Sequence, residues 1–242
     1  MRIPWIALVA AGVACAPDDK DTARADTGQV SVEESRAAGS SATASASASA
    51  SATKVLFVGT SLTAGYGLTP ELSYPAVVAR LAEADGLPIQ IVNAGLSGET
   101  SAGALRRMDW LLRTPADVIV IETGANDGLR GLDPDSTRAN LERIVASVRR
   151  TQPGAGIVLV QMEAPPNYGF SYVRRFRAMY ADVARDEGVV LAPFLLDGVA
   201  GLPEMNQVDG IHPNRRGAEL VAANLWKALQ PVVARARRAA GD

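Results

Sequence analysis

The fold of this chain is decided by the stretch Val55-Leu-Phe-Val-Gly-Thr-Ser-Leu-Thr-Ala-Gly-Tyr-Gly67. Its apolar start is too short for a helix and is rich in strand formers, so it predicts a buried strand. That strand ends at Gly59, and Ser61 follows in a glycine-rich loop. In open α/β sheets, ligands bind at the carboxyl edge of the strands. Ser61 is therefore a candidate nucleophile or, in the simpler interpretation, only the cap of the next helix.

Composition narrows the class of protein. The chain has 242 residues, 48% of them apolar, which is enough for one sizeable hydrophobic core. A net charge of −2 supplies no basic surface, so nucleic acid is not an expected partner. The single Cys excludes an internal disulfide. One Cys and one His also disfavour a structural zinc site, and no metal is expected.

The N-terminus predicts a signal peptide over residues 1–15. Arg2 supplies a positive charge, and residues 3–14 form an apolar run without further charge. The run is too short to span a bilayer as a helix and has the form of a secretory signal. We therefore expect an exported protein of the cell envelope.

The only Cys of the chain, Cys15, directly follows Ala11-Gly-Val-Ala14. This segment resembles the lipobox of bacterial lipoproteins, although Gly12 stands where Leu is usual. The resemblance implies membrane anchoring through a lipidated Cys15. Two alternatives stay open, namely ordinary cleavage to a periplasmic or secreted protein, and an uncleaved anchor.

Residues 16–53 predict a disordered tether. They show no apolar periodicity, and residues 37–53 contain only Ala, Ser, Thr and Gly. Such a segment cannot bury enough apolar surface to offset the entropy lost on ordering. The folded domain is expected over residues 54–242.

Within that domain, strand and helix patterns alternate. This alternation with short loops predicts a three-layer α/β/α sandwich around a parallel sheet. The apolar patterns place the strands at residues 55–58, 89–92, 118–121, 157–160 and 189–191, and the helices at residues 74–84, 101–112, 135–150, 172–187 and 214–238.

Four polar, glycine-rich loops follow strands or precede the last helix: residues 59–61, 93–95, 124–127 and 209–213. In a parallel sheet such loops share one edge. The last loop holds His212, the only His of the chain, three residues after Asp209. Residues three apart in a helical turn face the same way. Asp209 could thus hold the ring in the tautomer that accepts a proton from Ser61, as in a hydrolytic triad.

Taken together, these blocks resemble the Ser-Gly-Asn-His (SGNH) hydrolases, also called GDSL esterases, and within them the bacterial acyl thioesterase, lysophospholipase and arylesterase subgroup. The resemblance covers Val55 to the C-terminus and implies a flavodoxin-like SGNH hydrolase fold. The blocks that carry it are Gly59-Thr-Ser-Leu-Thr-Ala-Gly-Tyr-Gly67, Asn93-Ala-Gly-Leu-Ser-Gly-Glu-Thr100, Thr123-Gly-Ala-Asn-Asp-Gly-Leu-Arg-Gly131 and Asp209-Gly-Ile-His-Pro-Asn214.

The resemblance also implies roles for single residues. Ser61 would be the nucleophile, His212 the general base and Asp209 the group that orients it. The oxyanion hole would consist of the backbone N–H groups of Ser61 and Gly95 with the side-chain amide of Asn126. No metal or organic cofactor is required.

The chain departs from the family in one place, because Thr60 stands where the family has the Asp of Gly-Asp-Ser-Leu. Thr can still donate a hydrogen bond, so we expect activity with a different local network around the nucleophile loop. Four acids near the edge are expected to be capping or solvated loop residues, and not a glycosidase pair or a Mg²⁺ site. They are Glu122, Asp127, Glu163 and Asp197.

The predicted function is a serine esterase that hydrolyses acyl esters or thioesters through an acyl-enzyme intermediate. Export disfavours acyl-CoA as the substrate, which favours a lysophospholipid or another small acyl ester. Two alternatives stay open. One is a polysaccharide O-deacetylase of the same fold. The other is a non-catalytic envelope lipoprotein that only binds a ligand.

Overall fold

The computed structural model describes residues 52–241. The predicted signal peptide, Cys15 and nearly all of the predicted tether lie outside the described residues. The described part contains one five-stranded sheet in the order β2-β1-β3-β4-β5, and every strand pair is parallel. The predicted parallel sheet is therefore confirmed. Its strands are β1 (Thr53–Gly59), β2 (Ile89–Gly95), β3 (Val118–Ile121), β4 (Gly156–Val160) and β5 (Val190–Ala192).

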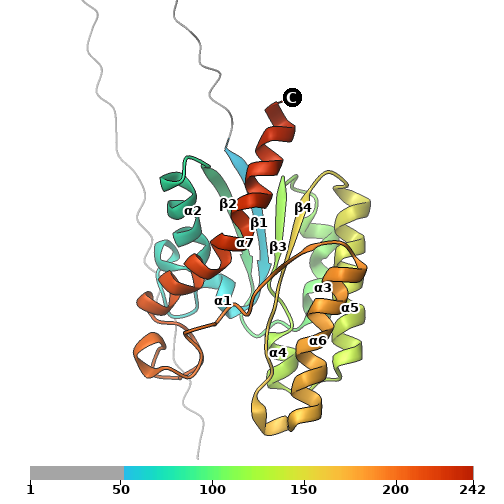
Figure 1. Cartoon of the computed structure of the whole chain (residues 1–242), viewed down its shortest axis with the longest axis vertical. Helices are drawn as coiled ribbons and strands as arrows, with labels where there is room; N and C mark the ends of the chain where they lie inside the picture. Colours follow the sequence, from blue (N-terminus) through green and yellow to red (C-terminus); the bar gives the residue numbers. More distant parts are fainter. Residues whose placement is uncertain (1–51, 242) are drawn as a thin grey trace, which may run out of the picture. The chain divides into compact units, whose positions relative to one another are not determined.

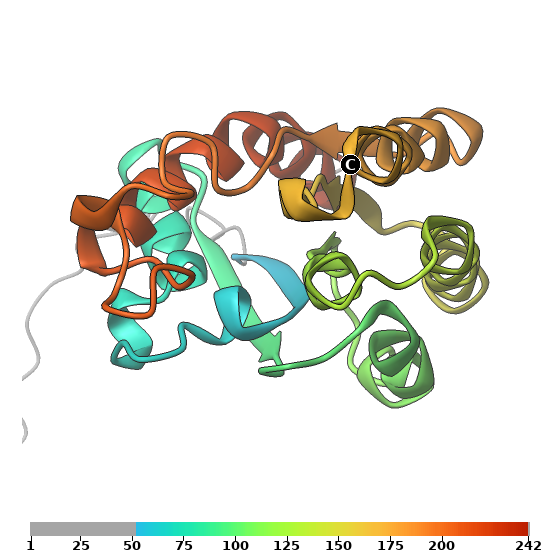
Figure 2. The ribbon, with the colours of Figure 1, turned by 90° about the horizontal axis from the view of Figure 1, so that it is seen from below.

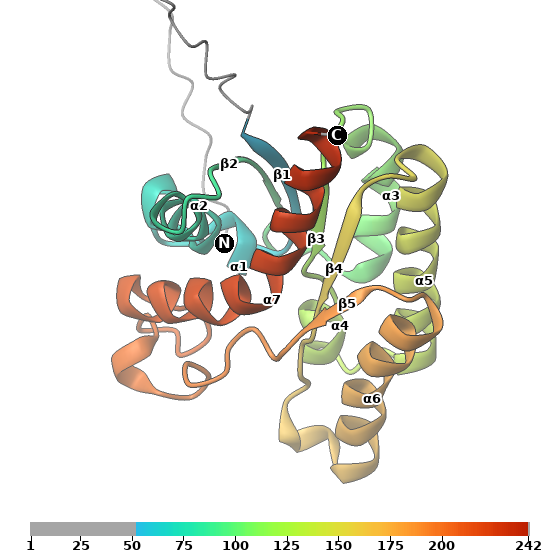
Figure 3. The same ribbon diagram turned by 45° about the horizontal axis from the view of Figure 1, so that its top comes forward.

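Helices cover both faces of the sheet (Figures 1 and 3). Helix α2 packs with α7 over one face, and α3, α5 and α6 form the layer over the other. This arrangement is the predicted three-layer sandwich. The helices are α1 (Ser61–Ala64), α2 (Tyr74–Ala84), α3 (Ser101–Leu111), α4 (Ala125–Leu129), α5 (Pro134–Thr151), α6 (Phe170–Asp186) and α7 (Arg215–Gly241), with 3-10 turns at Pro70–Leu72, Pro166–Tyr168 and Pro203–Met205.

The two innermost strands explain why the sheet forms. All four residues of β3 are buried with no exposed surface, and Val55 pairs in register with Val118 across the β1–β3 ladder. Unbroken apolar strands of this kind are typical of parallel sheets with helices on both faces. Because the strand order reverses between β1 and β3, the crevice between their carboxyl ends is where this architecture binds ligands.

The long elements follow the predictions to within a few residues. Two short helices, α1 and α4, were not predicted, because four and five residues are too few to show apolar periodicity. Both begin directly behind the carboxyl ends of β1 and β3, at the edge seen in Figure 2. No helix of the described residues is long and apolar enough to cross a membrane.

Candidate active site

Ser61 is the first residue of α1, two residues past the end of β1. The turn requires Gly59, because a Cβ there would overlap Thr63 Oγ1 and the Glu122 carboxylate. Glycine removes that clash and lets the chain turn tightly from the strand into the helix. The sequence between β1 and α1 therefore places the Ser61 hydroxyl at the carboxyl edge of the central strands, as predicted.

The structure brings Ser61, His212 and Asp209 into one hydrogen-bonded chain. Ser61 Oγ lies 2.9 Å from His212 Nε2, and His212 Nδ1 lies 2.7 Å from Asp209 Oδ2. Asp209 Oδ1 accepts the backbone N–H groups of Ile211 at 2.9 Å and His212 at 3.0 Å. These contacts fix the carboxylate against the ring, as the three-residue spacing predicts.

The hydrogen bonds also set the charge of this carboxyl. The His212 backbone N–H, the His212 ring and the Ile211 N–H, in that order of effect, lower the pKa of Asp209 to about 2. Asp209 is therefore ionised at neutral pH and accepts a hydrogen bond from the N–H of His212 Nδ1. With Nδ1 protonated, His212 Nε2 is left as the acceptor for the hydroxyl of Ser61.

A pocket of about 780 Å³ opens beside this chain of hydrogen bonds. Ser61, His212 and Asn126 all lie on its wall, which is mostly apolar. Its volume falls within the range of small-molecule binding pockets. The apolar part of the wall is contributed by Leu62, Tyr66, Ala125, Leu129, Met162, Ala164, Pro165, Pro166, Phe194, Leu196, Ala200 and Ile211.

Of the predicted oxyanion donors, Ser61 and Asn126 lie on this pocket. Asn126 Nδ2 donates to the backbone oxygen of Glu99 at 3.0 Å, which holds the amide in place and leaves its second N–H free to point elsewhere. The structure differs from the prediction at Gly95, whose backbone N–H donates to Asn93 Oδ1 at 2.9 Å. A Cβ at Gly95 would overlap the backbone N of Ala64, so glycine is needed there to pack β2 against α1.

Gly98, three residues after the end of β2, is the glycine of this block that lies on the pocket. It lies on the pocket wall with φ +77°, a conformation that favours glycine. Arg130 Nη2 donates to its carbonyl oxygen at 3.0 Å. Within residues 52–241 its own N–H has no hydrogen-bond acceptor. The sequence block contains both glycines, and only the three-dimensional placement separates them.

Glu122 contacts Thr60, the residue before Ser61, and is completely buried. Its Oε2 accepts the backbone N–H of Thr60 at 2.9 Å and the hydroxyl of Thr63 at 2.8 Å, and its Oε1 accepts the Thr60 hydroxyl at 3.0 Å. Burial raises the pKa of Glu122 to about 7, and these hydrogen bonds oppose the rise. Thr60, in the place of the family Asp, thus still takes part in a network that holds the nucleophile loop.

The four acids are expected to be capping or solvated loop residues. Solvation is wrong for two of them, whereas Asp127 accepts the N–H of the first residue of α3, as a helix cap does. Glu122 and Asp127 are buried, and Asp127 accepts the Ser101 backbone N–H at 2.8 Å and the Thr137 hydroxyl at 3.2 Å. Glu163 instead pairs with Arg177 at 3.2 Å, and Asp197 is exposed. Periodicity alone could not show that the first two face inward.

Tyr66 and Gln207 connect the Ser61 side of the site to the His212 side. The Tyr66 ring lies 4.6 Å from the His212 ring, centroid to centroid. Gln207 Nε2 donates to Tyr66 O at 2.6 Å and to Pro213 O at 3.0 Å. These contacts join two segments that are far apart in the sequence, and no sequence pattern indicated them.

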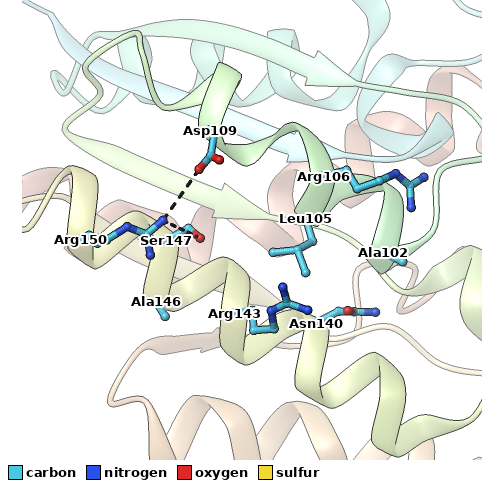
Figure 4. Close-up of a pocket in the computed structure, with 9 residues that line it drawn as sticks. All are labelled: Ala102, Leu105, Arg106, Asp109, Asn140, Arg143, Ala146, Ser147 and Arg150. Atoms are coloured by element: carbon cyan, nitrogen blue, oxygen red, sulfur yellow. Dashed lines mark hydrogen bonds and ion pairs between the residues drawn. The ribbon is translucent and has the colours of Figure 1, made fainter.

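A second hollow of about 550 Å³ lies between α3 and α5 (Figure 4). Three arginines line it, and Arg150 is 3.8 Å from Asp109 and donates to Ser147 Oγ at 3.4 Å. It shares no lining residue with the pocket at Ser61. Within the described part of the chain, no group of three or more His, Cys, Asp or Glu residues could hold a metal ion.

A serine hydrolase has a serine hydrogen-bonded to an imidazole, which is in turn hydrogen-bonded to a carboxylate. The structure shows this arrangement at the carboxyl edge of a parallel sheet. The comparisons with known proteins agree. The family model described as "GDSL-like Lipase/Acylhydrolase family" matches residues 57–220. The chain belongs to this family, and it is a carboxylic ester hydrolase.

Relatives with names support the same class. Esterase TesA of Pseudomonas aeruginosa is 39% identical over 74% of this chain and 89% of its own length, and an arylesterase of Vibrio mimicus is 37% identical over 73% and 90%. Thioesterase 1/protease 1/lysophospholipase L1 of Escherichia coli is 36% identical over 74% and 84%. The crystal structure of TesA matches with a TM-score of 0.70 at 38% identity, over 74% of this chain and 99% of that one.

Proposed function

We propose that Ser61 attacks the carbonyl carbon of an acyl ester or thioester and that the acyl group is then released by water. The observation that carries this proposal is the unbroken chain from Asp209 through His212 to Ser61, at 2.7 and 2.9 Å, beside an apolar pocket. A free hydroxyl is a weak nucleophile and requires a base within hydrogen-bonding distance. His212 Nε2 meets that requirement.

The reaction proceeds in two halves. His212 accepts the Ser61 proton as the Oγ–carbon bond forms, and then donates it to the leaving alcohol or thiol, which gives an acyl-enzyme. In the second half, His212 takes a proton from water, hydroxide adds to the acyl carbon, and the acid leaves as Ser61 is reprotonated. The negative oxygen of each tetrahedral intermediate is stabilised by the N–H groups of Ser61 and Gly98 and by the Asn126 amide, because these donors share the pocket.

The substrate class that fits the pocket is an ester with a medium or long apolar acyl chain, such as a lysophospholipid. A wall of Leu, Met, Pro and Phe side chains removes acyl methylenes from water, each worth about 0.8 kcal/mol. An O-acetylated polysaccharide would gain little from that wall. The names of the relatives, which include an arylesterase and a lysophospholipase, support small acyl esters as the class.

We also propose that the protein is exported and anchored through a lipidated Cys15. The proposal is supported by Arg2, the apolar run at residues 3–14 and the placement of the only Cys. Incorporation of radiolabelled palmitate in the producing bacterium should be lost in Cys15→Ser. Incorporation that persists in that variant contradicts the proposal.

The test of the catalytic proposal is hydrolysis of p-nitrophenyl esters from acetate to palmitate by the wild type, Ser61→Ala and His212→Ala. Each variant should lose about 10³–10⁶-fold in kcat, since the pair acts as a unit. Ser171→Ala, an exposed serine on α6, is the matched control and should behave as the wild type. Activity that survives in Ser61→Ala contradicts the assignment, and activity on acetate alone favours the deacetylase.

A further inference from the structure

The exposed apolar side chains of this domain are concentrated at one edge. Residues 52–241 expose ten large apolar side chains, and all except Trp110, on α3, lie in the loops, short helices and helix ends at the carboxyl edge of the sheet. The other nine are here called the apolar rim. They are Tyr66, Leu96, Leu129, Leu132, Tyr168, Phe170, Leu202, Val208 and Ile211.

The apolar rim draws on the segments that follow all five strands. Tyr66, Leu129 and Ile211 are themselves on the pocket wall. The others are within four residues of a wall residue in the sequence. Leu96 precedes Ser97, for example, and Leu202 follows Gly201. Figure 2 looks onto this edge of the domain, where the loops meet. The rim and the pocket that holds Ser61 therefore share one edge of the domain.

Such a concentration requires an explanation. Single exposed apolar residues are normal on a protein surface, whereas clustered ones mark an interaction site. The most exposed members of the rim are Phe170, which is 80% exposed, and Val208, which is fully exposed. Tyr66, Tyr168 and Phe170 are aromatic, and aromatic side chains are the type enriched where lipid meets water.

Charge at the rim indicates the chemistry of the partner. Arg130 lies between Leu129 and Leu132 in the chain, and the Arg174 guanidinium lies 5.5 Å from the centre of the Phe170 ring. Neither arginine has a carboxylate partner among the described ion pairs. Three acids of this edge are paired to other side chains, namely Asp133 with Arg175, Glu163 with Arg177, and Asp209 with His212. Asp197 and Glu204 are exposed at the same edge and are in none of the described ion pairs.

We propose that the apolar rim seats the domain on a lipid surface that contains anionic phospholipids, so that a single-chain lipid ester enters the pocket directly from that surface. This inference rests on the proposed function, because it names where the substrate of that site comes from. A protein partner on the rim would close the entrance, whereas a lipid surface both covers the rim and supplies the substrate. The cost of exposing the acyl chain to water during transfer is then avoided.

The kinetic test compares the double variant Phe170→Ser/Val208→Ser with Trp110→Ser in the full chain. None of these residues lines the pocket, and Trp110 is an equally apolar side chain exposed away from the rim. Soluble p-nitrophenyl butyrate should be cleaved by both variants within about twofold of the wild type. For p-nitrophenyl palmitate in phosphatidylglycerol vesicles, the rim variant should fall at least tenfold, because burying each apolar side chain in lipid is worth a tenfold or greater change in binding, and Trp110→Ser should not.

A sedimentation assay measures how the rim contributes to vesicle binding when no substrate is hydrolysed. In a Ser61→Ala background, the same variants are sedimented with phosphatidylglycerol and with phosphatidylcholine vesicles. The N-terminal segment is common to all the proteins, so only the difference between variants counts. The rim variant should require about tenfold more phosphatidylglycerol for half-binding than Trp110→Ser, and phosphatidylcholine should bind both less well.

The outcomes separate the two proposals. Equal vesicle binding by the rim variant and Trp110→Ser overturns the proposal that the rim contacts lipid. A loss of activity by the rim variant that is as large on soluble butyrate as on palmitate in vesicles also overturns it. A wild type that cleaves butyrate through Ser61 but no long-chain ester, dispersed or in vesicles, overturns the proposed substrate class. The sedimentation result still decides the rim in that case.

Discussion

Ser61 and His212, the proposed nucleophile and base, are held in opposite ways. Ser61 follows a central strand, and the residues behind it, Thr60 and Glu122, are 1% and 0% exposed. His212 and Asp209 lie in the irregular segment 193–214, where the Asp209 side chain is 37% exposed. The first side is part of the hydrophobic core, and the second is a loop on the surface of the domain.

The segment 193–214 contains no strand and no long helix, and side-chain to backbone hydrogen bonds hold its conformation instead. Asn206 Nδ2 donates to Val199 O at 2.6 Å and to Leu202 O at 2.8 Å, and Asn214 Nδ2 donates to Asn206 O at 3.1 Å. Interactions on the Ser61 side are buried and are therefore coupled to the stability of the whole domain. The hydrogen bonds of Asp209 are exposed and local, so their loss should reduce activity more than stability.

Among the variants that test this comparison, Asp209→Asn is expected to have the largest effect on activity. An amide can present its N–H to His212 Nδ1, which moves the ring proton to Nε2 and removes the acceptor for Ser61. We expect kcat on p-nitrophenyl butyrate to fall about 10³-fold, while the thermal midpoint changes by only a few degrees because the side chain is partly exposed.

Asp197→Asn, an exposed acid in the same segment, serves as the control and should leave kcat unchanged. A large drop in the thermal midpoint of Asp209→Asn would show that the His212 side is as strongly coupled to the core as the Ser61 side. The contrast between the two sides would then be wrong.

On the Ser61 side, Glu122→Gln should change stability with a distinct pH dependence. The pKa of Glu122 is raised from 4.5 to about 7 in the folded protein, so the native state binds more protons than the unfolded state between these values. The free energy of unfolding therefore falls as the pH rises from about 4.5 to about 7, by about 3 kcal/mol from this group. Glutamine has no such titration, so the difference between the variant and the wild type should grow in its favour over this range.

The measurement is urea unfolding of both proteins at several pH values from 4 to 8. Other groups that titrate in this range contribute equally to both proteins and cancel in the difference. Glu142→Gln, which replaces a half-exposed partner of Arg138, is the matched control and should show a nearly constant difference. Parallel curves for Glu122→Gln and the wild type would contradict the proposed burial penalty.

These contrasts also explain which features the sequence could predict. Apolar periodicity identified the parallel sheet, because the four buried residues of β3 leave one continuous apolar run. The short spacing between Asp209 and His212 predicted a contact that depends on only one turn of chain. Both predictions rest on local patterns.

The remaining features depend on contacts between distant segments. The sequence could not separate Gly95 from Gly98, because one glycine is required by packing against Ala64 and the other lies on the pocket wall. It also could not show that Glu122 turns inward to Thr60, 62 residues away. A polar residue behind a strand has the same local pattern whether it faces solvent or the core.

The smallest expected effect comes from Gln207, the residue that joins the two sides. Its amide donates to Tyr66 O and Pro213 O, and Tyr66 lies against the His212 ring. Gln207→Ala removes both hydrogen bonds, each worth about 1 kcal/mol, without removing a group of the triad. We expect kcat to fall up to about tenfold with KM unchanged, because the distance between Ser61 and His212 becomes less well fixed.

Gln90→Ala, on an exposed position of β2, should have no effect on kcat. An unchanged kcat in Gln207→Ala would mean that the two sides keep their geometry independently, and that the buried network at Thr60 and the Asp209 hydrogen bonds are each sufficient for their own half of the site.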